Sequence, residues 1–453
     1  MAGLDDTLAL IEARRDEQLE TLYRLLRQPS ISAQDVGVRD CAELVRELMT
    51  ANGIDARLIE TGGQPVVYGE AGPAEGAGRT VLVYGHYDVQ PPEPLDEWHS
   101  PPFEPTVREG RIYARGAGDN KGQCLAHILA AGALRDTGGL PLRLKFLIEG
   151  EEEIGSANLH RFVESERALL AADLAYSSDG PMHADGHPVV FYGLRGLLYI
   201  ELRARGANRD LHSGNYGGTV PNPAWTLVQL LATMRDAHGR MLIDGYYDAV
   251  RPPTPFEEEL LAGIPYDADA YARELDLRPD ERLDAATFHR RLMFEPTCNI
   301  AGFVSGYGGP GSKTVIPHEA TVKMDFRLVA DQDPEEIWER VRRHVERHAP
   351  GVELLRHGST PPSKTSPELP ECRAVARAVA AARGVEPVIL PSLGGSGPDY
   401  LFTKVLGIPS IWVPYAPWDE RNHAPNESIG VEDFVAGIKT SATVFAHLAA
   451  AEA

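Results

Sequence analysis

The stretch VLVYGHYD at residues 81–88 joins a short apolar run to a histidine and an aspartate. Such a run is typical of a buried strand, and open α/β sheets place their ligands at the carboxyl ends of their strands. His86 and Asp88 are two residues apart, so on an extended chain they point to the same side. A histidine can bind a metal there while the carboxylate fixes its ring. Alone, the pattern is more typical of a strand-end histidine hydrogen-bonded to an aspartate.

Other junctions between expected apolar segments and loops also carry a histidine or carboxylates. They are Asp119 in RGAGDNKG (115–122), the acids of EGEEEIGS (149–156), Asp179 in SSDG (177–180) and His423 in RNHAPNE (421–427). Most have an ordinary structural explanation, such as a helix-capping role for Asp119. The acid run is different, because carboxylates crowded at the end of an apolar strand repel one another and need water or a cation.

Taken together, these junctions indicate a two-metal centre. Hard oxygen ligands combined with imidazole suit Zn²⁺, Mn²⁺ or Co²⁺. Two histidines and three carboxylates can hold two divalent cations about 3.5–4 Å apart. Three carboxylates against two divalent ions leave one positive charge, which a bridging hydroxide neutralises. We therefore expect these distant motifs to converge in the fold.

The alternation of apolar runs and helical patterns indicates an α/β fold. Buried strands are expected near residues 81–84 and 142–148, with a helix over 120–135 between them. This order favours a mostly parallel sheet. Apolar residues at helical spacing predict one amphipathic helix over residues 4–27.

After Pro188 the order of expected elements becomes strand, helix, strand, strand, helix, strand, which is the ferredoxin-like pattern. We therefore expect residues 1–188 and 368–453 to form one catalytic domain, interrupted by a smaller α+β domain at 189–367. The acidic, proline-rich stretch 237–296 is expected to decorate this inserted domain.

Composition excludes several classes of partner. The formal net charge of −22 disfavours nucleic acid and anionic membranes. The four cysteines are scattered without CxxC spacing, which argues against a thiolate zinc site and a disulfide scaffold. The opening residues MAGLDDTLAL do not resemble a signal peptide, and no apolar run reaches about 18 residues. We therefore expect a cytoplasmic protein without nucleic-acid or membrane partners.

The motifs resemble those of the carnosinase/aminoacylase/carboxypeptidase G family of two-metal hydrolases, metallopeptidase family twenty. HxD, RGxxDxKG, EEEIGS, SDG and a late histidine occur in the family's order over nearly the whole chain. The resemblance implies a zinc-peptidase-like catalytic domain with an inserted ferredoxin-like lid and dimerisation domain. It implies two divalent ions per subunit, zinc or manganese, with cobalt also suitable. The implied metal ligands are His86, Asp119 (bridging), Glu153, Asp179 and His423.

The resemblance also assigns two acids that work beside the metals. Asp88 is implied as the clamp of the His86 ring, and Glu152 as the general base. The acid run leaves the choice of base ambiguous, although counting back from the IGS that follows it places base and ligand at Glu152 and Glu153. In this family the peptide bond after the bridging aspartate, here Asp119–Asn120, is often cis.

The predicted lid carries motifs of the family's dipeptidase branch. DLHSGNYGG at 210–218 implies that His212 reaches into the active site of a partner subunit, which requires a homodimer. SKTVIP at 312–317 and the strand with Arg327 resemble the family's substrate-binding strand. Thr314 and Arg327 are therefore implied as substrate contacts, with Arg327 gripping a carboxylate.

A glycine-rich loop is expected to complete the substrate site. GGSGP at 394–398 resembles the family's GGSIP loop, with Gly397 in place of isoleucine. Its backbone N–H groups and the Ser396 hydroxyl are expected to hold the same carboxylate, so Gly395 and Ser396 join the predicted contacts. The glycine changes the expected shape of the pocket at this point.

The expected activity is hydrolysis of the peptide bond of dipeptides or short peptides by a metal-bridging hydroxide. Glu152 would take the proton of the water and pass it to the leaving amine, while one metal and His212 stabilise the oxyanion. An N-acyl amino acid deacylase or amidase on the same scaffold stays open as an alternative. A binding protein that has lost catalysis is disfavoured, because every ligand candidate and Glu152 are present.

Overall fold

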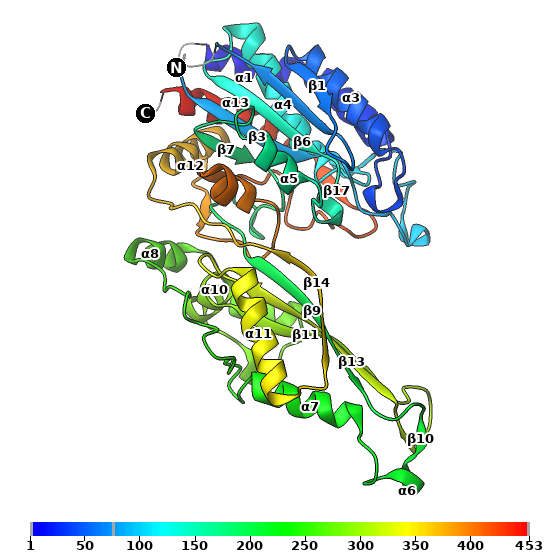
Figure 1. The fold of residues 1–453 in the computed structure, drawn as a ribbon. Coiled ribbons are helices and arrows are strands. Elements are labelled where there is room, and N and C mark those ends of the chain that lie inside the picture. The colour runs from blue at the N-terminus through cyan, green and yellow to red at the C-terminus, as the bar shows by residue number, and fades with distance from the viewer. Residues whose placement is uncertain (1–2, 75–77, 451–453) are drawn as a thin grey trace.

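A computed structural model describes residues 3–74 and 78–450 and shows two bodies, a larger one above an elongated one in Figure 1. The larger body contains an eight-stranded sheet in the order β1-β2-β6-β3-β7-β16-β8-β15. Its strands are β1 (Asp55–Ile59), β2 (Val66–Ala71), β3 (Thr80–His86), β6 (Arg143–Glu149), β7 (Leu174–Ser177), β8 (Val189–Phe191), β15 (Val388–Leu390) and β16 (Ser410–Trp412). Neighbouring strands β6, β3, β7 and β16 are parallel, so their carboxyl ends meet at one edge.

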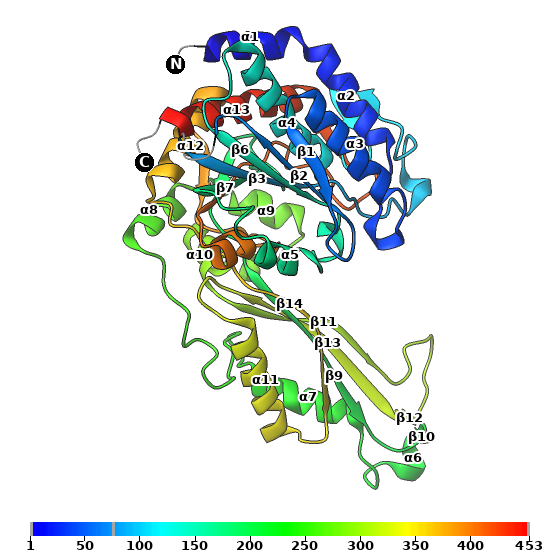
Figure 2. The ribbon, with the colours of Figure 1, turned by 45° about the horizontal axis from the view of Figure 1, so that its top comes forward.

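Helices cover both faces of this sheet, as Figure 2 shows. One face packs against α1 (Leu4–Ala13), α2 (Arg15–Arg27), α3 (Val38–Ala51), α4 (Lys121–Thr137), α12 (Pro370–Arg383) and α13 (Val431–Ala450). The other packs against α5 (Leu159–Ser165) and the π-helix at Leu401–Leu406. The single helix predicted over 4–27 is two helices that meet at Arg14, because α1 packs on α13 and α4 while α2 packs on α4 and α3.

The elongated body confirms the ferredoxin-like expectation. Its antiparallel sheet has the order β11-β13-β9-β14, and two helices cover one face. The elements are β9 (Gly196–Arg205), α7 (Pro223–Met234), β11 (Thr297–Ser305), β13 (Glu319–Leu328), α11 (Pro334–His348) and β14 (Glu353–Thr360). Every second residue of β13 is buried, including Val322, Met324 and Phe326, because alternate side chains of a strand face the helices.

Two small sheets complete the fold. β10 (Leu211–His212) pairs with β12 (Val315–Ile316) at the tip of the elongated body farthest from the large sheet, next to α6 (Ser213–Tyr216) (Figures 1 and 2). β4 (Thr106–Arg108), β5 (Arg111–Tyr113) and β17 (Ser428–Gly430) form a three-stranded sheet. Within residues 3–74 and 78–450, no helix has both the length and the apolar character needed to cross a membrane.

Residues 237–296, which were expected to decorate the lid, pack on the lid and on the larger body as well. This stretch forms α8 (Pro255–Gly263), α9 (Ala268–Glu274) and α10 (Ala285–Phe294). Leu261 and Met293 belong to the buried cluster that contains Leu390 of the large sheet, whereas Ile243 belongs to the core of the elongated body. Their apolar side chains draw the helices onto the larger body, so the stretch packs against both.

The chain crosses between the bodies near residues 192–195 and 361–369. β8 pairs with β15 and β16 in the large sheet, although the sequence suggested that the lid begins at residue 189. We therefore propose that the first boundary lies after Phe191, and we retain 367 and 368 as the proposed second boundary.

Candidate active site

The expected ligand residues lie where the parallel strands of the large sheet end. His86 is the last residue of β3, and β6 ends at Glu149, the first acid of the acid run. Asp179 follows β7, and the loop with His423 follows β16. Asp119 precedes α4, whose first residue is Lys121. Because these strands share one edge of the sheet, loops far apart in sequence meet above it.

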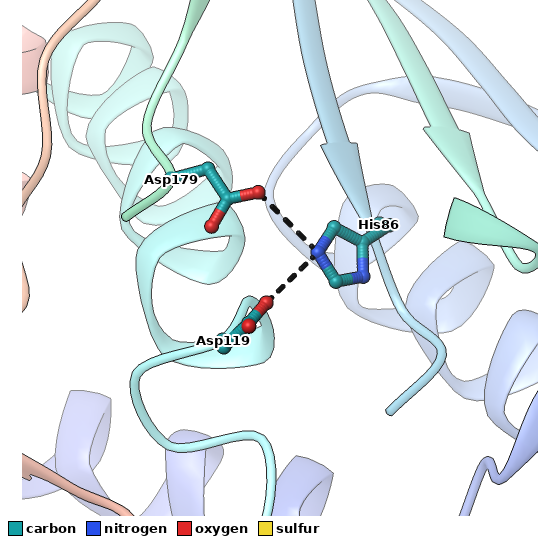
Figure 3. A group of neighbouring side chains, drawn as sticks. All are labelled: His86, Asp119 and Asp179. Atoms are coloured by element: carbon teal, nitrogen blue, oxygen red, sulfur yellow. Dashed lines mark ion pairs between the residues drawn. The ribbon is translucent and has the colours of Figure 1, made fainter. Parts of the chain in front are cut away.

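Two groups of side chains share Asp119 at this edge. The Nε2 atom of His86 lies 3.1 Å from Asp119 Oδ1 and 3.5 Å from Asp179 Oδ2, as Figure 3 shows. The Nε2 atom of His423 lies 3.1 Å from Asp119 Oδ2 and 3.2 Å from Glu153 Oε2. The potential ligand atoms within each group all lie within 4.8 Å of one another. The structure thus brings the five residues together, with Asp119 between the two groups.

The chemistry of this cluster fits divalent cations. His86 Nε2 is buried and, among the described residues, has no hydrogen-bonding partner, although two carboxylates face it. Burial, and then the charge of Asp119, raises the pKa of Glu153 and of Asp179. Contacts with Asp119 and Glu153 raise the pKa of His423 to about 10. The acids therefore require positive charge, which two divalent ions would supply while also satisfying the orphaned nitrogen.

Asp88 holds two parts of the site in place. Its Oδ1 atom lies 3.4 Å from His86 Nδ1, which also lies 3.1 Å from the Asp88 carbonyl oxygen. The same carboxylate accepts hydrogen bonds from the backbone N–H of Glu152 at 3.2 Å and of Glu153 at 3.1 Å. The Asp88 side chain thus fixes the first turn of the 3₁₀ helix that carries both glutamates, as well as the orientation of the His86 ring.

The acid run divides into carboxylates with different surroundings. Glu149 accepts hydrogen bonds from the hydroxyls of Tyr84 and Ser156. Glu151 accepts hydrogen bonds from the side chain of Asn158. The carboxylates of Glu149 and Glu151 therefore accept hydrogen bonds that stabilise the surrounding fold.

The other two acids of the run face the site. Glu153 contacts His423 and accepts a hydrogen bond from Gln90 Nε2 at 2.9 Å. Among the described residues, the Glu152 carboxylate has no hydrogen-bonding or ion-pair partner, and burial raises its pKa well above the ordinary value. A β-carbon built on Gly397 would lie 3.7 Å from Glu152 Oε1, so this carboxylate faces the glycine-rich loop.

Sequence reasoning missed a buried ion pair beneath Asp119. Glu427 Oε1 accepts hydrogen bonds from the backbone N–H groups of Gly118 and Asp119, both at 3.0 Å, and Oε2 accepts one from Arg115 Nη1 at 2.6 Å. Both side chains of the pair are about 1% exposed. Glu427 lies only four residues after His423, so the pair joins the loops that carry two of the candidate ligands. A charged residue directly before an apolar strand was the available signal.

Asn120 is a second residue without an earlier assignment. Its side-chain Nδ2 donates a hydrogen bond of 2.6 Å to the carbonyl oxygen of Ser178, next to Asp179. The Asp119–Asn120 peptide bond is cis. Asn120 therefore links the loop before α4 to the loop after β7.

The expected substrate contacts fall into two sets. Arg327 Nη1, on the lid, donates a 2.7 Å hydrogen bond to Ser396 Oγ of the glycine-rich loop, so these two residues meet at the junction of the two bodies. The carbonyl oxygen of neighbouring Gly395 accepts a hydrogen bond from the Arg195 backbone. His212 ends β10, and Thr314 directly precedes β12, the other strand of that small sheet. Both residues are exposed at the far tip of the lid, and this chain does not bring them to its own site (Figure 1).

Comparisons with known proteins find similar sequences and a similar fold over almost the whole chain. The family model described as peptidase family M20/M25/M40 matches residues 82–447. The Cys-Gly metallodipeptidase dug1 of Schizosaccharomyces pombe is 31% identical, covering 99% of this chain and 98% of that protein. The Beta-Ala-His dipeptidase of Homo sapiens is 30% identical, covering 99% and 93%. The structure of the M20 family metallo-carboxypeptidase Sso-CP2 from Sulfolobus solfataricus matches with a TM-score of 0.89 and 37% identity, covering 96% of this chain and 99% of that one.

The Glu427–Arg115 pair should strengthen the binding of divalent metal without contacting the metals. We expect Glu427→Gln to weaken binding of divalent metal about 10- to 100-fold, because the Asp119 backbone loses its anionic anchor and Arg115 stays buried without a countercharge. Titration calorimetry of the metal-free protein with zinc or manganese measures this. Asp419→Asn is the matched control, since Asp419 forms a half-exposed ion pair with Arg111 near the same loop. Equal metal affinity in both variants would contradict the assignment.

Proposed function

The chain belongs to peptidase family M20/M25/M40, and on that premise we propose that it is a metal-dependent dipeptidase. The observation that carries this proposal is the pair of ligand groups that share Asp119 at the edge of the sheet. Its substrates are dipeptides or short peptides, and the bond that breaks is the peptide bond.

Two divalent ions per subunit are the proposed cofactors. His86, Asp119 and Asp179 would hold one ion, and Asp119, Glu153 and His423 the other. Zinc or manganese is proposed, with cobalt also compatible with these donors. When bound, such ions lower the pKa of a water molecule held between them, so that hydroxide is available near neutral pH.

Glu152 is the proposed general base. Its carboxylate has no partner among the described residues, it adjoins the candidate ligand Glu153, and it faces the glycine-rich loop. In this position it can accept a proton from the attacking water and return it to the nitrogen of the leaving residue. Asp88 would hold Glu152 in position by accepting a hydrogen bond from the Glu152 backbone N–H.

The C-terminal carboxylate of the substrate is the proposed ligand of Arg327, Ser396 and Gly395. The hydrogen bond between Arg327 and Ser396 supports this, because it places a guanidinium and a hydroxyl on adjacent sides of one space. A carboxylate bound there can accept hydrogen bonds from both groups. An anchor for the C-terminal carboxylate would select short substrates.

We propose that the active enzyme is a homodimer and that His212 and Thr314 act in the partner's site. Both residues are exposed at the tip of the lid, remote from their own metal groups. β11 is an edge strand with Ile300 and Val304 53% and 73% exposed, and α7 carries Trp225 at 63%. Such an apolar edge is typical of a surface that pairs with another chain.

The cytoplasm is the proposed location. The four cysteines are free, and three of them are buried. Free thiols without disulfides are usual for proteins of a reducing compartment.

A dipeptide panel tests the proposed activity. We expect the purified protein to hydrolyse Ala-Gly and Ala-Leu after reconstitution with zinc or manganese, and to lose this activity with a chelator. Ninhydrin or chromatographic detection of the released amino acids measures it. Faster turnover of N-acetyl amino acids than of every dipeptide would instead support a deacylase.

The Glu152 assignment is tested by replacing one oxygen. We expect Glu152→Gln to retain its metal content and to lose turnover by about 10²- to 10⁴-fold, because the proton acceptor is gone. Elemental analysis and initial rates measure the two properties. The control is Glu151→Gln, since Glu151 is engaged by Asn158 and the variant should keep turnover within a few-fold. Unchanged turnover in Glu152→Gln would refute the assignment.

Mixing two inactive variants tests the shared site. His212→Ala keeps its own Glu152, and Glu152→Gln supplies an intact His212 to its partner. Heterodimers of the two should therefore contain one complete site and regain activity that neither homodimer has. Differently tagged chains, purified in tandem, allow the heterodimer to be assayed alone. No recovery in purified heterodimers would count against His212 acting across subunits.

A further inference from the structure

Gly397 lies in a loop that is held in place by hydrogen bonds from Arg195, a residue of another segment of the same chain. The loop connects β15 to the π-helix, and two hydrogen bonds from Arg195 hold it. The Arg195 backbone N–H donates to the Gly395 carbonyl oxygen, and its Nε donates to the Gly394 carbonyl oxygen, both at 2.9 Å. Arg195 belongs to the segment that crosses into the lid. The position of residue 397 is therefore set by both bodies.

The backbone does not require glycine at this position. Gly397 is not among the glycines with a left-handed φ, so any residue can adopt its conformation. The following Pro398 favours an extended conformation for residue 397, which also suits side chains other than hydrogen. The related motif has isoleucine here. The reason for glycine must therefore be sought in the surroundings of residue 397 rather than in its backbone conformation.

Residue 397 lies between the proposed base, Glu152, and the proposed carboxylate anchor formed by Ser396 and Arg327. Among the described residues, and apart from its chain neighbours, a β-carbon on residue 397 would meet two atoms within 4 Å. Leu194 Cδ1 would lie at 3.1 Å, closer than an ordinary contact, so the Leu194 side chain would have to shift, and Glu152 Oε1 would lie at 3.7 Å. The preceding residue, Ser396, contacts Arg327. A side chain at 397 would thus extend from the carboxylate anchor toward the proposed base, along the apolar surface of Leu194.

We propose that Gly397 enlarges the subsite for the C-terminal residue of the substrate, so that the enzyme accepts dipeptides whose C-terminal residue is large and apolar. This rests on the proposed dipeptidase function, in which that residue spans from Glu152, near its nitrogen, to Arg327 and Ser396, at its carboxylate. Leu194 supplies the apolar wall. Gly397 is a specificity-determining position here and takes no part in proton transfer.

The test compares Ala-Gly, Ala-Leu and Ala-Phe as substrates of the full-length, metal-loaded enzyme and of two variants. We expect Gly397→Ile to lower kcat/KM for Ala-Leu and Ala-Phe about 10-fold or more, chiefly through KM, because its side chain fills the subsite. Ala-Gly should change less than about 3-fold, since it places no side chain there. Gly397→Ala should fall between wild type and Gly397→Ile and guards against a folding defect in the larger variant.

A second change provides a rescue. Leu194→Ala added to Gly397→Ile should restore part of the Ala-Leu activity, because it returns volume to the same space. Metal content should match wild type in every variant. The thermal denaturation midpoint should stay close to wild type in Gly397→Ala, whereas variants with Leu194→Ala should melt at a lower temperature, because Leu194 is buried. An equal loss for all three dipeptides, or no loss for any, would overturn the subsite while leaving the dipeptidase function intact. Failure of the wild-type enzyme to cleave any dipeptide would overturn the function, and the subsite with it.

Discussion

Carboxylates crowd together at one buried edge of the large sheet, and their mutual repulsion governs how the site around them is built. Asp119 lies between His86 and His423 and also adjoins Asp179 and Glu153. Such a cluster is unfavourable unless cations neutralise it. The parallel strands bring the acids together, and the metals that the family uses make their proximity favourable. The binding site is thus a consequence of how the sheet is ordered.

A second layer of buried contacts holds the loops that carry these acids in place despite their mutual repulsion. Asp88 binds the backbone of the proposed base and of its neighbour, and Glu427 binds the backbone of Asp119. Glu427 is itself neutralised by Arg115, because a buried carboxylate without a countercharge would be costly. These contacts position the proposed base and the candidate metal ligands. The two residues proposed to bind the substrate carboxylate come from different bodies, since Arg327 belongs to the lid and Ser396 to the larger body.

Much of the site could be predicted because its signals are local. His86, Asp119, Glu153 and Asp179 stand close after an apolar run or before a helix, so a short window of sequence shows both the strand end and the acid or histidine. The spacing of Asp88 two residues after His86 is of this kind. His423 lies farther from the end of β16, in the loop that follows it. The β-α-β-β-α-β order of the lid also follows from local patterns, and the observed strands match it closely.

The α/β class, the inserted ferredoxin-like body and the candidate metal ligands could be predicted before folding was considered, because strand and helix periodicity and motif spacing are properties of neighbouring residues. Three features emerge only from the folded chain: Glu152 has no side-chain partner among the described residues, Glu427 anchors the Asp119 backbone, and residues 237–296 pack against both bodies. The folded chain also places His212 far from its own site. These features depend on contacts between residues up to hundreds of positions apart, and such contacts exist only after the sheet is ordered and its faces are covered.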